Sequence, residues 1–215
     1  MEATEQSRRL TALREELSKR DLAAYVVPRS DEYMLEYVPP SGERLAWLTG
    51  FTGSAGLALV GRARAALFVD GRYTEQAAQQ TPSRLWEHHH LIDTPPAAWL
   101  EQAVQSGERV GYDPRVHTPA NLEALRAALE RAGATLLPVE SNLVDVVWSD
   151  RPAEPAAPVE VYPEQLAGES AVAKRRRMAD QLASEKLDAL IVSAADSLAW
   201  LLNIRGRDLE NTPFA

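Results

Sequence analysis

The chain has 215 residues, 45% of them hydrophobic and 25% charged, which is ordinary for a globular protein with room for one domain and part of another. A formal net charge of −8 argues against a nucleic-acid binder, and the absence of cysteine excludes disulfide bonds and thiolate metal sites. The chain begins polar and charged and holds no apolar run of membrane-spanning length, so we expect a cytoplasmic protein without membrane contact.

The first two thirds of the chain alternate between helix-like and strand-like patterns. Leu10, Leu13 and Leu17 share one face of a helix predicted over 5–19, and the apolar run 22–27 that follows is typical of a buried strand. Irregular residues come next, and then, in order, a helical turn over 43–48, a hairpin of strands 57–60 and 65–69, a helix over 73–80, a strand over 85–92, a helix over 95–105, a strand over 109–112, a helix over 118–132 and a strand over 135–139. This order predicts an α/β fold whose hairpin makes the sheet mixed.

The stretch GFTGSAG at 50–56 is the most distinctive loop of the chain. Three glycines in seven residues permit positive φ angles and close backbone approach. The spacing matches neither a dinucleotide fingerprint nor a P-loop, and no Lys-Ser or Lys-Thr pair follows. We therefore predict a tight structural turn that leads into the first hairpin strand.

The pattern then starts again after a proline-rich linker at 150–163. Residues 174–192 align without gaps on 9–27, and the sequence LAWL at 45–48 recurs at 198–201. The offset falls from 165 to 153, so the first copy carries 12 additional residues, in the Tyr- and Pro-containing loop before LAWL. Helix, strand and LAWL recurring in one order indicate a duplicated domain.

The second copy has a helix, a strand over the segment 187–192 and one further helical turn before the chain stops at Ala215. Such a half-copy exposes a sheet edge and apolar surface. We expect a fragment, or a chain that another polypeptide completes. The basic run 174–177 lies on the helix of this copy and is expected to form a solvated face.

Two side-chain clusters could carry chemistry. His88 and His90 would share one face of a strand, but a useful metal site needs a third ligand at a recognisable spacing, so a polar strand face is the favoured interpretation. Asp31, Glu32 and Glu36 could serve acid–base chemistry or bind a divalent cation, although such a cluster is more often a solvated loop. The residues alone indicate no complete active site.

Five stretches of the chain resemble the front end of a Xaa-Pro aminopeptidase (aminopeptidase P) of the long, three-domain type. They are SDEYMLEYVPPSGERLAWLTGFTGSAG at 30–56, ALFVDGRYTEQA at 66–77, GYDPRVHT at 111–118, NLVDVVW at 142–148 and DSLAWLLNIRGRDLENTP at 196–213. Tyr33 departs from the family pattern, which often has histidine after Asp-Glu. The resemblance implies a creatinase/prolidase-like N-terminal domain over 1–149, a linker over 150–168 and an incomplete second creatinase-like domain over 169–215.

The resemblance also implies a function. In such enzymes a C-terminal metallopeptidase domain holds two divalent metals, usually manganese, and releases the residue that precedes proline. None of its five ligands maps onto this sequence, so we expect no cofactor in this chain and no activity from it alone. By analogy, the chain would form homodimer contacts and line the entrance to the active site, through which peptides with proline at the second position would pass.

Candidate residues for that entrance or interface are Asp31, Tyr33, Glu36, Tyr37, Arg44 and Arg205. Two alternatives stay open. The first is a non-enzymatic protein-binding module, a pseudo-peptidase that keeps the fold without the metal ligands, which the acidic charge permits. The second is creatinase or prolidase proper, whose usual single N-terminal domain disagrees with the repeat.

Overall fold

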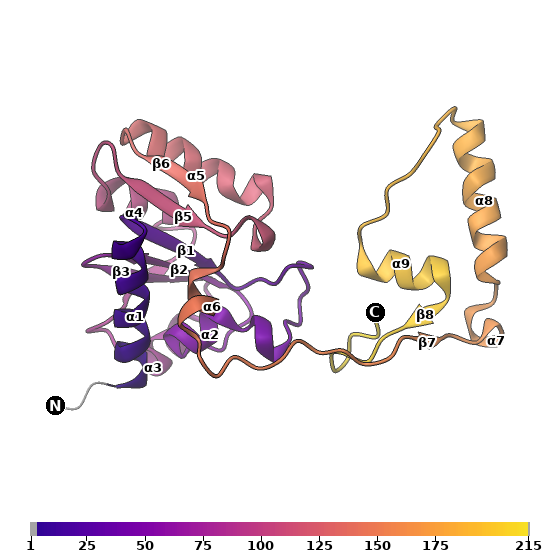
Figure 1. The fold of residues 1–215 in the computed structure, drawn as a ribbon, viewed down its shortest axis with the longest axis horizontal. Helices are drawn as coiled ribbons and strands as arrows, with labels where there is room; N and C mark the ends of the chain where they lie inside the picture. The colour runs from indigo at the N-terminus through magenta and orange to yellow at the C-terminus, as the bar shows by residue number, and fades with distance from the viewer. Residues whose placement is uncertain (1–3, 215) are drawn as a thin grey trace. The chain divides into compact units, whose positions relative to one another are not determined.

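The computed structural model describes residues 4–214. Its chain divides into two units, the first ending at Pro152 and the second beginning at Ala153 (Figure 1). The first unit is an α/β structure around a six-stranded sheet. No helix in the described part of the chain is long and apolar enough to cross a membrane.

The sheet of the first unit has the strand order β4-β3-β2-β1-β5-β6. Its strands are β1 (Ala24–Pro28), β2 (Gly56–Gly61), β3 (Ala65–Val69), β4 (Glu87–His90), β5 (Arg109–Tyr112) and β6 (Thr135–Pro138). The hairpin β2–β3 and the pair β1–β2 are antiparallel, whereas β4, β5 and β6 each pair in parallel with their neighbour. The prediction of an α/β fold with a mixed sheet is therefore confirmed.

Helices cover both faces of this sheet. They are α1 (Glu5–Lys19), α2 (Arg44–Thr49), α3 (Thr74–Gln80), α4 (Pro96–Ala103), α5 (Pro119–Arg131) and α6 (Leu143–Val147). One core cluster packs α1, α2, α3 and α6 against one sheet face, and a second packs α4 and α5 against the other. Because successive strand residues point to opposite faces, Tyr25 joins the first cluster and Val26 the second.

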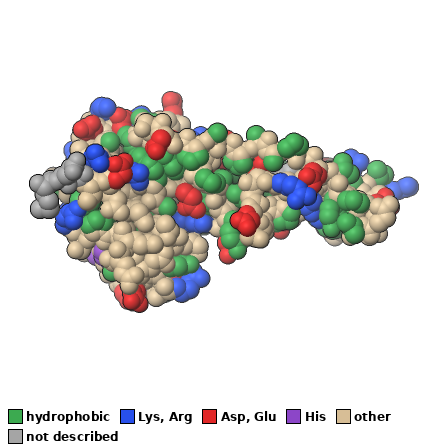
Figure 2. Space-filling model, turned by 90° about the horizontal axis from the view of Figure 1, so that it is seen from below, with side chains coloured by type: hydrophobic (Ala, Val, Ile, Leu, Met, Phe, Trp, Pro, Cys, Tyr) green, Lys and Arg blue, Asp and Glu red, His purple; other side chains and the backbone are tan. Residues whose placement is uncertain are grey.

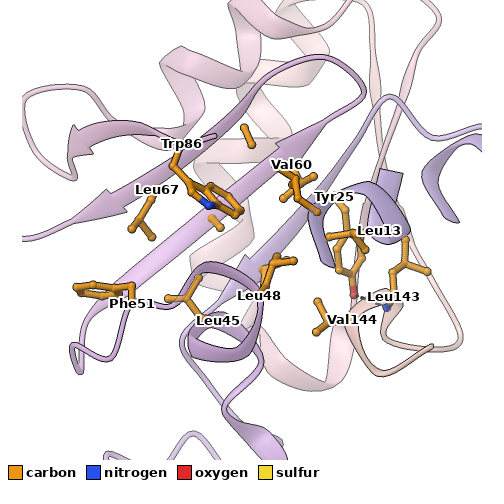
Figure 3. Packing of buried hydrophobic residues seen from close by; sticks show 14 of the residues in the cluster. Leu13, Tyr25, Leu45, Leu48, Phe51, Val60, Leu67, Trp86, Leu143 and Val144 are labelled. Atoms are coloured by element: carbon orange, nitrogen blue, oxygen red, sulfur yellow. Dashed lines mark hydrogen bonds between the residues drawn. The ribbon is translucent and has the colours of Figure 1, made fainter. Parts of the chain in front are cut away.

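The central strand β1 is the best-buried part of the first unit. Its residues Ala24 to Val27 are all at most 1% exposed, as a strand covered on both faces requires. Figure 3 shows Tyr25 with its hydroxyl turned to α6, where it accepts a hydrogen bond from the amide of Leu143 at 3.3 Å. Leu13 of α1 lies close by and is fully buried.

The ends of the observed elements lie within two residues of the predicted ones in this unit, and two elements lose the most residues. The predicted strand 85–92 begins only at Glu87, because Leu85 and Trp86 donate their amides to Pro82 in a turn. It ends at His90, whose ring Nδ1 accepts from the amides of the next turn. The predicted helix 95–105 ends at Ala103, and the Glu108 carboxylate instead binds the amide of Gln105 at 2.7 Å.

The glycine loop 50–56 is a tight structural turn, as predicted. Gly50 ends α2 with a φ of 84°, and a Cβ there would lie 2.3 Å from Nε2 of Gln6. A Cβ on Gly53 would clash with the ring of Phe51 at 2.3 Å. Side chains already bind two of the loop amides, since Phe51 donates to Thr49 and Thr52 donates to Gln80.

The second unit holds α7 (Glu164–Ala167), α8 (Ala171–Ser184), α9 (Ala195–Leu202) and a two-stranded ribbon of β7 (Glu160–Val161) and β8 (Ile204–Arg205). The predicted strand over 187–192 is wrong, because this segment is not paired in the described structure. Its counterpart β1 is paired with β2 on one side and β5 on the other. The described part of the second unit has no strand that corresponds to β2 or to β5. Leu190 and Ile191 are 50% and 92% exposed, and hydrophobic side chains reach the surface of this unit in Figure 2.

The two units nevertheless repeat the same helix ending. One residue past the cap of α1, Asp21 has a φ of 51°, and one past the cap of α8, Lys186 has a φ of 58°. The next amide then reaches back to the helix over the same 2.9 Å, from Leu22 to the carbonyl of residue 17 and from Leu187 to that of residue 182. Both helices thus end in the same left-handed cap at the sequence offset of 165.

A second matched feature joins the first helix of each unit to its LAWL helix. In the first unit, Arg9 donates to the carbonyl of Trp47 and lies 4.6 Å from its ring centre. In the second, Lys174 donates to the carbonyl of Trp200 at 2.8 Å and lies 4.4 Å from its ring centre. These pairs correspond at the offsets 165 and 153, so the second unit begins as a copy of the first.

The predicted solvated face of the basic run is wrong for Lys174. This residue is 2% exposed, and its ammonium also donates to Oδ1 of Asn203 at 2.7 Å. The next three arginines of the run are exposed, as expected. The helical periodicity predicts that Lys174 lies on the polar side of α8. In the structure, α9 and its cap residue Asn203 pack there and accept hydrogen bonds from the ammonium group.

Candidate functional site

The candidate site lies where the strands of the first unit end. The residues after β1, β3, β4 and β5 share one edge of the sheet, because Pro28 lies opposite Leu57 and Val69 lies beside both Gly56 and His90. In open α/β sheets, ligands bind beyond the carboxyl ends of parallel strands. The longest connection at this edge is the segment 29–43 after β1, which we call the rim loop; it includes the 3₁₀ turn Pro40–Gly42.

Asp31 shapes the tip of the rim loop from inside. It is 1% exposed, and its Oδ1 accepts hydrogen bonds from the amides of Tyr33 at 3.1 Å and Leu35 at 2.9 Å. This bonding wraps the chain so tightly that Met34 takes a φ of 57°, in the left-handed region that disfavours residues other than glycine. Asp31 is therefore placed to hold the loop, and its carboxylate does not face solvent.

Arg29 fixes the base of the same loop. Its guanidinium donates to the carbonyl of Glu36 and lies 3.4 Å from Oε1 of Glu43. Burial raises the pKa of Glu43; the charge of Arg29 opposes that rise and the charge of Asp31 adds to it. The two ends of the loop are thus tied together across its width.

Arg44 lies beneath the rim loop and joins it to α6. It is 2% exposed, its Nε and Nη2 bind the two oxygens of Asp145 at 2.7 and 2.9 Å, and its Nη2 binds Glu32 at 2.7 Å. Burial acts to lower the pKa of Arg44, but its hydrogen bonds with Asp145 and Glu32 outweigh this and raise it. Arg151 closes the arrangement by donating to Ser41 at 2.8 Å and pairing with Asp145 at 3.2 Å.

This geometry separates the predicted entrance or interface residues of the first unit into two groups. Asp31 and Arg44 are buried and hold the loop, whereas Tyr33, Glu36 and Tyr37 are exposed on it. The tyrosines expose 75% and 52% of their surface. Only the exposed group is available to a ligand or to another protein, so the buried pair would act by positioning it.

Sequence reasoning missed a buried polar centre beside the loop, around Asp113 after β5. Asp113 is fully buried and accepts from Asn142 at 3.0 Å and from the backbone and side chain of Arg115. Burial acts to raise the pKa of Asp113, but these hydrogen bonds hold it below its usual range. His117 donates from Nδ1 to the carbonyl of Asp113 at 2.9 Å. The signal was present in the stretch 111–118, where a polar Asp directly follows a buried strand.

The histidine stretch does not form a metal centre. His88 bonds to Thr81 at 2.6 Å, and His89 stacks on Phe68 with ring centres 5.2 Å apart. His90 lies 3.5 Å from Asp93. Within residues 4–214, no three His, Asp or Glu side chains are grouped so that they could hold a metal ion. The two metals implied by the resemblance therefore find no ligand set here.

Arg205 lies in the second unit and is engaged within it. Its guanidinium carbon is 4.1 Å from the ring centre of Tyr162, and its Nη1 donates to the carbonyls of Ile204 at 2.7 Å and Ala199 at 3.3 Å. It thus braces β8 against α9 and the residue that follows β7. The predicted entrance residues do not form one cluster within a single unit.

The sheet order, the buried strand β1 and the repeated pair of a capped helix and a LAWL helix define a creatinase-type N-terminal domain followed by the first part of another. Family models of the creatinase/prolidase N-terminal domain match residues 9–147 and, as a second type, residues 150–215. The chain belongs to the creatinase/prolidase N-terminal domain family.

The curated relatives are much longer than this chain. It is 38% identical over 216 residues to the probable Xaa-Pro aminopeptidase P of Aspergillus niger. This alignment covers 99% of this chain and 35% of the fungal protein. The corresponding protein of Paracoccidioides brasiliensis is 37% identical with the same coverage. The chain therefore spans about a third of the length of these relatives.

Solved structures that are similar to this chain support the same family assignment. The X-prolyl aminopeptidase of Caenorhabditis elegans, a cytosolic enzyme with a di-nuclear active site, matches 99% of this chain with a TM-score of 0.85 and 30% identity, over 37% of its own length. The N-terminal domain of the cytoplasmic peptidase PepQ from Mycobacterium tuberculosis matches 65% of this chain with a TM-score of 0.50 and 28% identity. The first of these matches spans both units.

Proposed function

We propose that this chain is the N-terminal, non-catalytic portion of a metal-dependent Xaa-Pro aminopeptidase of the cytosol. The observation that supports this most is the match of both units, in order, to the first third of long proteins of that name. The catalytic chemistry, including two divalent metals, would belong to polypeptide beyond this sequence. Dimer contacts and the restriction of access to peptide ends would be the contribution of this chain.

The rim loop is the part of the chain best suited to that contribution. It lies at the carboxyl edge of the sheet, is tied down by Asp31, Arg29 and Arg44, and displays tyrosine side chains to solvent. A fixed loop of this kind can select which peptides reach a neighbouring active site, since positioning requires groups that do not move. The buried residues would hold the rim, and the exposed ones would meet the peptide or a second copy.

The test is to purify the native protein from its source cells with an antibody against this segment. We expect a species more than about twice 23.7 kDa that cleaves Xaa-Pro peptides when manganese is added, and no cleavage by the 215-residue chain alone. A native species of 23.7 kDa would contradict the proposal. A long species without manganese-stimulated cleavage would favour the pseudo-peptidase alternative, a protein-binding module.

A further inference from the structure

Arg151 lies where the linker leaves the first unit, and it is bound to the base of the rim loop. Its Nε donates to the carbonyl of Ser41 at 2.8 Å, and its Nη1 lies 3.2 Å from Oδ2 of Asp145. The side chains of Arg151 and Asp145 are only 24% and 18% exposed, so solvent screens this ion pair less than a surface pair. The amide of Arg151 also donates to the carbonyl of Trp148 at 3.2 Å. The start of the linker is therefore tied to the loop by a side chain and to the end of α6 by its backbone.

A first series of contacts leads from Arg151 to the tip of the rim loop through the 3₁₀ turn Pro40–Gly42. Ser41 is 1% exposed, and its carbonyl accepts the hydrogen bond of Arg151 from within this turn. The next residue lies directly beside Asp31, since a Cβ added to Gly42 would be 3.5 Å from the Cβ of Asp31. Asp31 is the buried carboxylate whose two amide bonds shape the tip. A shift of the turn would therefore displace the residue that holds the tip.

A second series of contacts runs through the ion pairs beneath the loop. One oxygen of Asp145 serves both arginines, since its Oδ2 lies 3.2 Å from Nη1 of Arg151 and 2.9 Å from Nη2 of Arg44. The same Nη2 of Arg44 donates to Glu32 at 2.7 Å. Opposite charges thus alternate from Arg151 to Glu32, and the loss of one member weakens the placement of its neighbours. Both series of contacts end at the adjacent residues Asp31 and Glu32, at the base of the tip.

The tip of the loop is the element that can change its arrangement. Met34 has a φ of 57°, and a backbone in this left-handed region persists only while the surrounding contacts determine it. Those contacts are the bonds from Asp31 to the amides of the residues on either side of Met34. If Asp31 moves, Met34 can relax to an ordinary conformation, and the exposed side chains of Tyr33 and Tyr37 would be rearranged.

We propose that Arg151 couples the linker to the rim loop, so that a change in the backbone of the linker alters the order of the loop tip. Coupling between distant groups needs contiguous contacts and an element with two arrangements, and the loop has both. Pro152 acts on this coupling directly, because a residue that precedes proline is biased toward extended backbone, which orients Arg151. A partner that binds the linker would thereby rearrange the exposed tyrosines. Such coupling does not depend on the proposed function, because it concerns the order of the loop and not the cleavage of peptides.

The experiment compares amide hydrogen exchange in variants of the 215-residue chain. Arg151→Met removes the charge and the hydrogen bonds of the side chain but keeps its apolar stem. The amides of Tyr33 and Leu35 should then exchange about tenfold faster, because Asp31 holds them less firmly. A merely structural role would speed exchange throughout the first unit, so the amides of β1 are the internal reference and should change by less than about twofold. Unchanged exchange at the tip, or an equal acceleration in β1, would overturn the proposal.

Two exposed prolines test the linker itself. Pro152→Gly frees the backbone of Arg151 and should speed exchange of the same two tip amides about threefold. The matched control is Pro158→Gly, which loosens the linker further along and should leave the tip unchanged. A second control is Arg109→Met, which removes an arginine bound to Asp21 elsewhere in the first unit and should also leave the tip unchanged. Equal effects of the two proline variants, or no effect of Pro152→Gly, would overturn the coupling.

Discussion

The two units start with the same local structure and bury it to different extents. Leu13 and Leu17 of α1 are 0% exposed, whereas their counterparts on α8, Met178 and Leu182, are only partly buried. The central strand of the first unit has become an exposed, unpaired segment in the second. Helix caps and turns are thus specified by nearby residues, while a strand and a core exist only where other segments cover them.

Core truncation should give the largest difference between the units. We expect Leu13→Ala to destabilise the first unit by about 2–5 kcal/mol, because a fully buried leucine leaves a cavity. The matched Leu182→Ala should cost under about 1 kcal/mol, since that side chain is already partly in water. Urea unfolding, monitored by hydrogen exchange in each unit, measures the loss of unfolding free energy that each substitution causes. Equal costs would mean that α8 is covered in solution.

The buried Arg44 has no counterpart in the second unit, where Ser197 stands at its place in the repeat. Arg44→Met should destabilise the first unit by about 3 kcal/mol, because Glu32 would lose its ion pair and Asp145 would keep only Arg151 as a partner. The rim loop should also exchange its amides faster, notably that of Leu35. The double variant Arg44→Met with Asp145→Leu should recover part of the stability. Unchanged exchange in the loop would contradict the positioning role of Arg44.

Most of the first unit was predictable because its signals are local. The leucine spacing of residues 5–19 predicts α1, and the Thr118 cap, which accepts from the amide of Asn121, predicts the start of α5. Arg44, Lys174 and the segment 187–192 could not be predicted in the same way. Two basic residues are buried by acceptors far away in sequence, and the segment 187–192 lacks the neighbours that a strand needs.

The matched Arg9–Trp47 and Lys174–Trp200 contacts allow a test within one chain. We expect Lys174→Met to cost about 1–2 kcal/mol in the second unit, since it leaves Asn203 and the Trp200 carbonyl without their donor. Arg9→Met should cost less in the first unit, about 0.5–1 kcal/mol, because this side chain is 23% exposed and α1 has a large buried face besides. Thermal unfolding with a probe in each unit compares the two. A larger loss for Arg9→Met would show that the two contacts are not equivalent.

The smallest expected difference is in the response to pH, because all four histidines lie in the first unit. Burial lowers the pKa of His117 despite its hydrogen bond to Asp113, and burial also lowers the pKa of His88. Each histidine then takes up a proton more readily when unfolded, so its contribution to stability is lost as the pH falls below the unfolded value of about 6.5. The first unit should therefore unfold at lower urea concentration at pH 5.5 than at pH 7.5, and the second unit, whose sequence holds no histidine, should respond less to the same change of pH. His117→Gln keeps a donor for the Asp113 carbonyl and should weaken this dependence on pH. An unchanged dependence would mean that His117 is protonated equally in the folded and unfolded chain.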